Sequence, residues 1–354
     1  MTAPSRAVLL LAHGTPETVE EIPEYLKNVV SGRALPDAVV KEIQHRYSQI
    51  GKSPLTEWTV RQAELLEASA ALPVYVGMRN WKPYIADTVR KMCADGITEA
   101  VAICLAPQNS RTSVGLYRRA ALAEAGQTLR LHFIDAWPDH PQLIAAFAER
   151  LRSTWTNACR EAGAAVPVIF TAHSVPCRTV QTAPAATELI EAKKEPVAKE
   201  KSDGPVRPTL PERSYAGPAS APQGPDPYAV EAKRTAARVA AAMADAGLQE
   251  RDWVFAFQSQ GASGGPWIGP SVEETLQALR AEGHTAVVLQ PIGFLCDHVE
   301  ILYDIDIAFQ AQAKQLGLKL WRPESLNDSP LLIAALADLT HTGVAALNAA
   351  PAIA

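Results

Sequence analysis

Short apolar runs of strand length alternate with longer helical stretches along most of the chain. The apolar runs, which we expect to be β-strands, cover residues 7–12, 74–77, 100–105, 131–136, 168–172, 253–258, 286–290 and 318–322. The clearest helical stretches between them cover residues 59–70, 83–94, 228–246 and 272–281. Unbroken apolar strands that alternate with helices are typical of parallel sheets covered by helices on both faces. The alternation therefore predicts an α/β fold.

Two phrases of the sequence occur twice, once in each half of the chain. VLLLAHGTP at residues 8–16 returns as VIFTAHSVP at residues 168–176. DGITEAVAICLAP at residues 95–107 has a counterpart in EGHTAVVLQP at residues 282–291. Chance similarity between apolar strands is the alternative explanation. The repetition indicates two structural units of similar topology.

We predict two similar α/β domains over residues 1–160 and 161–330, followed by a helix over residues 331–354 that closes the structure. The second domain carries an insertion, because nine of the 27 prolines and a highly charged run fall within residues 184–227. A segment of that composition buries little apolar surface. We therefore expect this insertion to be a mobile loop or linker.

Composition narrows the class of protein. The chain is 47% hydrophobic and 20% charged, with a net charge of −5. We expect no nucleic-acid partner, because proteins that bind nucleic acid carry a basic patch. The five cysteines form no C-x-x-C pair, which is typical of free thiols in a reducing cytosol rather than of zinc ligands. The apolar run after Arg6 is too short for a signal peptide, and we find no apolar segment of membrane-spanning length, so we expect a cytoplasmic protein.

Both copies of the repeated phrase place a histidine directly after an apolar strand. Ligands of open α/β sheets bind beyond the carboxyl ends of the strands. We therefore expect His13 and His173 to lie on opposite walls of one cleft between the two domains. A single histidine at a strand end is more often structural than ligating, so its neighbours decide its role.

The segment PIGFLCDHVEILYDID leads from a strand end into an expected helix. Asp297, Glu300 and Asp304 are three and four residues apart, so a helix would align them on one stripe, with His298 rotated away. The apolar residues among them indicate that some of these carboxylates face a cleft, and a solvated helix face is the alternative. Imidazole and carboxylate groups together suit ferrous iron and related metals, and they also suit proton transfer.

Two further segments carry polar side chains that could bind an anion. HRYSQIGKSPLTEWTVRQ contains Arg46, Tyr47 and Ser53, for which an ordinary turn and helix cap is an equal alternative. APQNSRTSVGLYRR opens a helix after a strand, where backbone N–H groups and Tyr117 could meet a carboxylate. The chain contains no G-x-G-x-x-G and no P-loop motif, which argues against a nucleotide ligand.

These segments together resemble the ferrochelatase family, bacterial type. The matching pieces occur in family order over nearly the whole chain: AHGTP, RYSQIGKSPLTEWTVRQ, GMRNWKP, DGITEAVAICLAPQ, TAHSVP, DPYAVEAKRTA, FQSQG followed by PWIGP, and PIGFLCDHVEILYDID. The resemblance implies two Rossmann-like domains around a porphyrin cleft. It also implies a lyase that inserts ferrous iron, its substrate, into a porphyrin in haem synthesis. No prosthetic group is expected, and the lack of cysteines near the C-terminus excludes the iron–sulfur cluster of some relatives.

The resemblance also implies roles for residues of this chain. His173 and Glu300 match the catalytic, metal-binding pair of the family, and which of the two takes protons and which binds iron stays open. The positions that match a proton or metal relay are Asp297, His298 and Asp304. The positions that match porphyrin contacts are His13, Arg46, Tyr47, Ser53 and Tyr117.

The chain departs from the family pattern at three places. His13 stands where many bacterial relatives carry tyrosine, which implies an axial ligand to bound iron or iron-porphyrin. Residues 184–227 form a longer segment than usual, and Val30 replaces an arginine expected to bind a propionate. Protoporphyrin IX and coproporphyrin III both stay open as substrates. The polar segment YLKNVVSGRALPDAVVKEIQHRYSQIG, where membrane-associated relatives carry an apolar lip, favours coproporphyrin III.

Other functions fit some of the same features. One is a cobalt or nickel chelatase acting on sirohydrochlorin, which would need more cationic residues in the cleft. Another is a non-enzymatic haem-binding or haem-delivery protein, which would bind haem without inserting metal. A periplasmic-type binding protein is disfavoured because we find no export signal. We expect a monomer with at most peripheral membrane contact.

Overall fold

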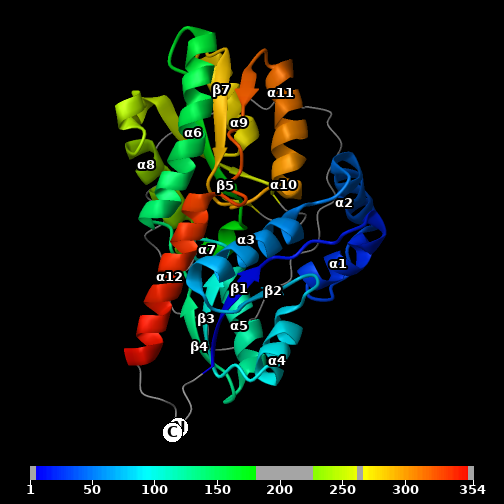
Figure 1. The fold of residues 1–354 in the computed structure, drawn as a ribbon. Helices are drawn as coiled ribbons and strands as arrows, with labels where there is room; N and C mark the ends of the chain where they lie inside the picture. Colours follow the sequence, from blue (N-terminus) through cyan, green and yellow to red (C-terminus); the bar gives the residue numbers. More distant parts are fainter. Residues whose placement is uncertain (1–4, 181–225, 261–265, 350–354) are drawn as a thin grey trace.

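The protein contains two four-stranded parallel sheets with helices on both faces (Figure 1). The computed structural model describes residues 5–180, 226–260 and 266–349, so nearly all of the predicted insertion lies outside the described residues. The first sheet, in the order β2-β1-β3-β4, consists of β1 (Arg6–Ala12), β2 (Val74–Met78), β3 (Glu99–Cys104) and β4 (Arg130–Ile134). The second, in the order β6-β5-β7-β8, consists of β5 (Val168–His173), β6 (Trp253–Gln258), β7 (Ala286–Pro291) and β8 (Lys319–Trp321). All eight predicted strands are confirmed.

The two sheets repeat one topology. In each half, the first strand along the chain lies between the second and the third. β1 and β5, which lead into the repeated Ala-His pairs, therefore hold equivalent positions in their sheets. β3 and β7, which carry the second repeated phrase, are equivalent neighbours. The internal repeat seen in the sequence is a repeat of structure.

Helices flank each sheet. Those of the first half are α1 (Ile22–Val29), α2 (Asp37–Ile50), α3 (Leu55–Ala70), α4 (Ile85–Ala94) and α5 (Val114–Ala125). Those that follow are α6 (Pro141–Ala162), α7 (Cys177–Val180), α8 (Tyr228–Ala241), α9 (Val272–Ala281), α10 (Val299–Leu302), a π-helix (Asp304–Phe309), α11 (Gln310–Gln315) and α12 (Pro330–Ala349). The four predicted helices are confirmed as α3, α4, α8 and α9, although α8 ends earlier than expected and a 3-10 turn at Ala244–Ala246 follows it.

Both faces of each sheet are buried, as unbroken apolar strands require. In β1, Val8 and Leu10 face one apolar cluster while Leu9 and Leu11 face another that includes residues of α4 and α5. The first of these clusters also includes side chains of α6 and of β5, among them Phe170. One continuous core therefore extends through both halves of the molecule.

Helices α6 and α12 join the two halves (Figure 1). α6, which precedes the predicted boundary at residue 160, contacts β7 and α8 as well as α12, so it packs with the second sheet. α12 contacts α3, β3 and β4, and a Cβ built on its Gly343 would meet the side chain of Val101 at 2.5 Å. The division into domains at residue 160 stays a prediction. By length and composition α12 could cross a membrane, but half of its most apolar window is buried inside the protein.

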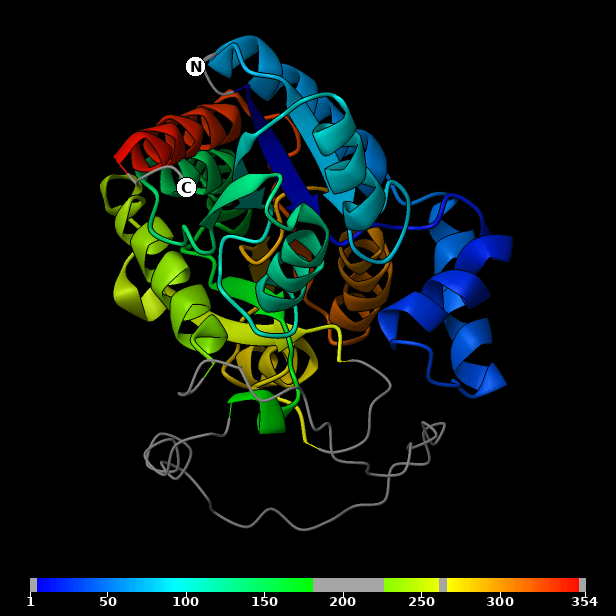
Figure 2. The same ribbon diagram turned by 90° about the horizontal axis from the view of Figure 1, so that it is seen from below.

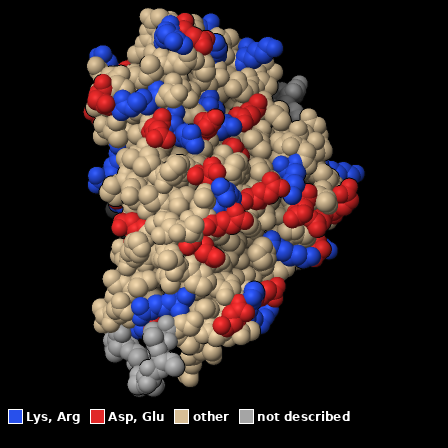
Figure 3. Space-filling model, in the orientation of Figure 1, with Lys and Arg blue, Asp and Glu red and all other residues tan. Residues whose placement is uncertain are grey.

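Helices α1 and α2 project from the first sheet and lie beside the second half (Figure 2). Ile22, Tyr25, Tyr47 and Trp81 form a small apolar cluster there, and the partly buried Val299 of α10 packs against it. On the face shown in Figure 3, positive and negative side chains are interspersed. The projecting helices thus bring first-half residues close to the start of α10.

Candidate active site

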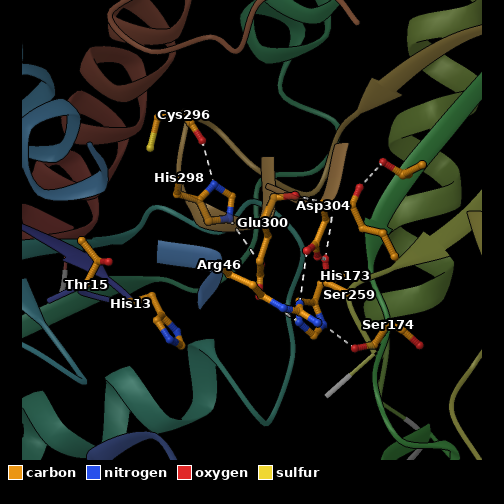
Figure 4. Close-up of polar contacts among 12 residues, drawn as sticks. His13, Thr15, Arg46, His173, Ser174, Ser259, Cys296, His298, Glu300 and Asp304 are labelled. Atoms are coloured by element: carbon orange, nitrogen blue, oxygen red, sulfur yellow. Dashed lines mark hydrogen bonds and ion pairs between the residues drawn. The ribbon is translucent and has the colours of Figure 1, made fainter. Parts of the chain in front are cut away.

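His173 and Glu300 form the centre of the site (Figure 4). His173 is the last residue of β5, and Glu300 lies in the first turn of α10. Nε2 of His173 is 3.2 Å from Oε1 of Glu300, and each side chain is 32% exposed. The carboxyl end of a parallel strand thus presents an imidazole to a helix start, where a carboxylate is favoured by the helix dipole.

His298 lies on the other side of the same carboxylate. Its Nε2 is 3.3 Å from Oε2 of Glu300, and its Nδ1 donates to the carbonyl oxygen of Cys296 at 3.0 Å. The expectation that His298 is rotated away is wrong, because α10 begins only at Val299 and His298 is an extended residue before it. Glu300 therefore lies between two imidazole rings.

The charges of this group are set by the ion pair. Burial lowers the pKa of His173, but the Glu300 carboxylate and the Ser174 carbonyl outweigh it and raise that pKa to about 9. Burial raises the pKa of Glu300, but His173 and His298 outweigh it and hold that pKa well below its usual value. At neutral pH the unliganded site therefore contains a His173 imidazolium facing a Glu300 carboxylate.

The predicted carboxylate stripe is wrong at its first member. Asp297 precedes α10, and its carboxylate accepts hydrogen bonds from Ser325 Oγ at 2.7 Å and Asn327 Nδ2 at 3.0 Å. A stripe at spacings of three and four needs one regular helix, and the backbone becomes helical only after His298. Asp297 and Glu300 consequently have different neighbours.

Asp304 extends the site toward the first half of the chain. It begins the π-helix, and its side chain is only 9% exposed. It accepts hydrogen bonds from Ser259 Oγ and from Arg46 Nη1, the latter at 3.3 Å. Burial raises its pKa, and the nearby Glu300 carboxylate adds to this effect. Arg46 also pairs with Glu42 at 3.0 Å, so the guanidinium bridges α2 and the π-helix.

His13 lies opposite this group, directly after β1 (Figure 4). Its ring is exposed, and its Nε2 is 3.1 Å from Tyr25 Oη and 3.0 Å from Asn80 Nδ2. Partial desolvation by its neighbours and the charge of Arg79 lower the pKa of His13, and the Glu300 carboxylate opposes them. Because the residue is exposed, solvent limits the size of this shift. The two repeated histidines therefore have opposite charge states at neutral pH: His13 is neutral and His173 is protonated.

The remaining predicted porphyrin contacts are buried. The hydroxyl of Tyr47 lies 2.9 Å from Thr15 Oγ1, and burial raises the pKa of Tyr117. The Ser53 hydroxyl is buried and has no hydrogen-bond partner among the described residues. A buried polar group without a partner costs free energy, and a ligand atom that reached Ser53 Oγ after a local opening of the chain would relieve that cost.

Two residues of the site escaped the sequence analysis. Gln258, at the end of β6, donates from Nε2 to the carbonyl oxygen of Glu300 at 3.0 Å and accepts from Thr171 Oγ1 at 2.6 Å. Tyr25 contacts His13, as described above. Tyr25 could have been found from the sequence, because it lies three residues after Ile22 and so shares the buried face of the helix. A tyrosine on a buried face usually finds a hydrogen-bond partner for its hydroxyl.

The group of Glu300 and its two histidines offers oxygen and nitrogen donors together. These suit a ferrous ion, and the same atoms accept protons. Within residues 5–180, 226–260 and 266–349 we find no arrangement of three or more His, Cys, Asp or Glu side chains that could hold a metal ion. Both ring nitrogens of His173 are engaged, by Ser174 and by Glu300, so the Glu300 carboxylate is the available anionic donor of the group.

Comparisons with known proteins identify the relatives of this chain. A family model described as Ferrochelatase matches residues 5–344. A protein named Ferrochelatase from Acidobacterium capsulatum is 59% identical over 98% of this chain and 97% of its own, and one from Deinococcus radiodurans is 37% identical over 94% of each. A Coproporphyrin III ferrochelatase from Geobacillus kaustophilus is 30% identical over 96% of each.

Among solved structures, SirB from Bacillus subtilis with Fe3+ shares the fold. Its TM-score is 0.50 at 10% sequence identity, over 97% of each chain. This likeness agrees with the two parallel sheets described above. The family model spans nearly every described residue, and the sequence identity to curated relatives extends over both halves. The chain belongs to the ferrochelatase family.

Proposed function

We propose that this protein inserts ferrous iron into a porphyrin in haem biosynthesis, with coproporphyrin III as the favoured substrate. The observation that carries the proposal is the Glu300 carboxylate between His173 and His298, with the neutral His13 on the opposite side. Metal insertion requires donors for the ion and acceptors for two pyrrole protons. The oxygen and nitrogen atoms of this group are the candidates for both roles.

The charge states suggest how His173 and Glu300 divide the work. Glu300 is anionic at neutral pH and is the natural first contact for a divalent cation. His173 is protonated in the unliganded site and accepts a pyrrole proton only after losing its own. A cation beside Glu300 promotes that loss by repulsion. We therefore propose that iron meets Glu300 first and that His173 releases its own proton to solvent. His173 then accepts the two pyrrole protons one after the other and passes each to solvent.

His13 faces the same space from the first half and carries a neutral ring. An unprotonated imidazole is a good donor to iron. We propose that His13 contacts the metal or iron-porphyrin as an axial ligand. The absorption spectrum of the bound product tests this proposal, because it shifts on His13→Ala if His13 is a ligand and is unchanged if it is not.

The carboxylates of the porphyrin need partners at the rim. Arg46, Tyr47, Ser53 and Tyr117 are proposed to meet them, and the unpaired hydroxyl of Ser53 supports the assignment. A relative named Coproporphyrin III ferrochelatase matches the whole chain at 30% identity, which supports the tetracarboxylate substrate. We further propose that the protein acts in the cytoplasm as a monomer, with no iron–sulfur cluster or other prosthetic group.

An anaerobic assay with ferrous iron tests the function, with coproporphyrin III and protoporphyrin IX offered in competition. A reaction without enzyme serves as the control. We expect the protein to consume coproporphyrin III before protoporphyrin IX. Preferential use of protoporphyrin IX would overturn the substrate assignment. Tight haem binding without insertion would instead favour the haem-delivery function, and insertion of cobalt or nickel into sirohydrochlorin alone would favour that chelatase.

A further inference from the structure

The Asp297 carboxylate is held by residues of the loop before α12. Ser325 Oγ and Asn327 Nδ2 donate to it, and Arg322 Nη1 lies 3.4 Å from its Oδ1. Arg322 itself makes two hydrogen bonds to Asp306, at 2.6 and 2.7 Å. The carboxylate is thus saturated with protein donors, and a proton or metal ion would have to displace them.

Asn327 holds the backbone as well as the side chain of this segment. The Asp297 N–H donates to Asn327 Oδ1 at 2.9 Å, and the Asn327 N–H donates to the Leu295 carbonyl at 2.9 Å. Asn327 has a φ of 48°, a left-handed conformation that asparagine tolerates better than most residues. Together with the bond to the carboxylate, Asn327 fixes residues 295–297 by three hydrogen bonds.

The same asparagine is anchored to the first half of the molecule. Its carbonyl oxygen accepts from Gln62 Nε2 of α3 at 2.7 Å, and Gln62 is 1% exposed. Ser325 and Leu326 beside it are buried too. A chain of hydrogen bonds therefore leads from a first-half helix, through Asn327, to the segment that precedes α10.

The start of α10 depends on that segment for its position. His298 is the N-cap residue and makes no side-chain capping bond, so the first turn has no cap of its own. Helix ends without caps fray, and Glu300 belongs to this first turn. The orientations of His298 and Glu300 toward His173 therefore depend on what holds residues 295–297, together with the bond from Gln258 to the Glu300 carbonyl.

We propose that Asp297 is a positioning residue, which fixes the approach to α10 so that Glu300 faces both histidines, and that it does not relay protons or metal. The proposal rests on the function proposed above and deepens it. It predicts that the shape and hydrogen bonding of residue 297 matter, while its charge and its proton do not.

Asp297→Asn and Asp297→Ala separate the two roles. The amide oxygen of Asn accepts from Asn327 and its NH2 group donates to Ser325 Oγ, so the long contact with Arg322 Nη1 is the one that is lost. The amide neither takes up a proton near neutral pH nor binds iron well. We expect Asp297→Asn to keep kcat within about threefold and Asp297→Ala to lower it about 10- to 100-fold, the usual effect of losing a residue that orients a ligand. KM for the porphyrin should change little in both. Equal losses in the two variants would overturn the proposal.

Asn327→Gly and Ser325→Ala are matched variants, because they remove bonds to Asp297 at residues that would carry neither protons nor metal. Glycine adopts the same positive φ, so only the side-chain bonds of Asn327 are lost. We expect Asn327→Gly to lower kcat as strongly as Asp297→Ala, and Ser325→Ala to lower it less. Normal kcat in Asn327→Gly would contradict positioning.

Hydrogen–deuterium exchange keeps the test independent of activity. Backbone amides of residues 298–302 should exchange faster in Asp297→Ala and Asn327→Gly, and at the wild-type rate in Asp297→Asn. An inactive wild-type protein would refute the proposed function, whereas unchanged exchange in all variants would refute the positioning role. A thermal melt of each variant confirms that it folds before either measurement.

Discussion

Nε2 of His173 lies 3.2 Å from Oε1 of Glu300, and this contact joins the end of a buried strand to the start of a helix from the same half. The separation leaves room for neither a metal ion nor a proton acceptor between the two groups. The ion pair of His173 and Glu300 therefore occupies the position between the two groups. The reaction must begin by separating the two side chains.

Replacing Glu300 with glutamine should lower the pKa of His173. In the wild type the carboxylate raises that pKa to about 9 against the effect of burial. Without the carboxylate, burial is opposed only by the Ser174 carbonyl and by Asp304, so the pKa of His173 in Glu300→Gln should fall well below 9. A histidine titration by NMR measures it, with Glu42→Gln as a control on an exposed carboxylate. A His173 pKa that stays near 9 would contradict the assigned pairing.

The pH dependence of kcat/KM should follow the same group. A base whose pKa is raised is unavailable below that pKa, so kcat/KM for the porphyrin should rise from pH 7 to about 9 and then level off. Well below this pKa, kcat/KM should rise about tenfold per pH unit. His173→Ala should lower the rate and remove this rise. An anaerobic pH series with both proteins tests it, and an identical rise in the variant would assign the titration to another group.

Ser53→Ala should separate stability from binding. The buried hydroxyl has no partner in the unliganded protein, so its removal should leave stability unchanged or raise it by up to about 1 kcal/mol. Porphyrin affinity should fall because the ligand loses a hydrogen bond. Urea unfolding and porphyrin fluorescence titrations measure the two effects. A variant that is less stable but binds normally would show that the hydroxyl has a structural partner instead.

Arg46→Ala should raise the KM for the porphyrin about tenfold, which is the scale of a charge-assisted hydrogen bond to a carboxylate. The guanidinium already pairs with Glu42 and Asp304, so the substrate has to compete for it. Glu42→Gln removes one exposed competitor and should leave KM unchanged or slightly lower. Steady-state kinetics with coproporphyrin III give both values. An unchanged KM in Arg46→Ala would exclude Arg46 from the porphyrin contacts.

Much of the fold could be predicted from the sequence because both faces of each sheet are buried. Val8 and Leu9 point to opposite faces of β1 and both meet apolar clusters, so the strand reads as an unbroken apolar run. The two repeated Ala-His pairs could also be recognised in the sequence, because each lies at the end of such an apolar strand. His173 could be chosen from the sequence because it ends a core strand, whereas Glu300 was singled out among its neighbouring carboxylates by the family resemblance.

The local structure around Asp297 and α10 could not be predicted from the sequence. Residue spacing assumes a regular helix through Asp297, yet the helix begins at Val299 and changes to a π-helix at Asp304. The true partner of Asp297 is Asn327, thirty residues away, and no local pattern connects them. Tyr25 contacts His13 because the cluster of Tyr25 and Trp81 holds α1 near the residue that follows β1, which is a tertiary relationship.

The core that extends through both halves bears on substrate choice. The inner faces of the two sheets belong to one close-packed cluster, and such interiors resist compression. The placement of His13 relative to His173 is therefore coupled to packing far behind the site. We expect a site whose two sides are coupled in this way to favour the bent macrocycle of the transition state over the flat ring of the free substrate.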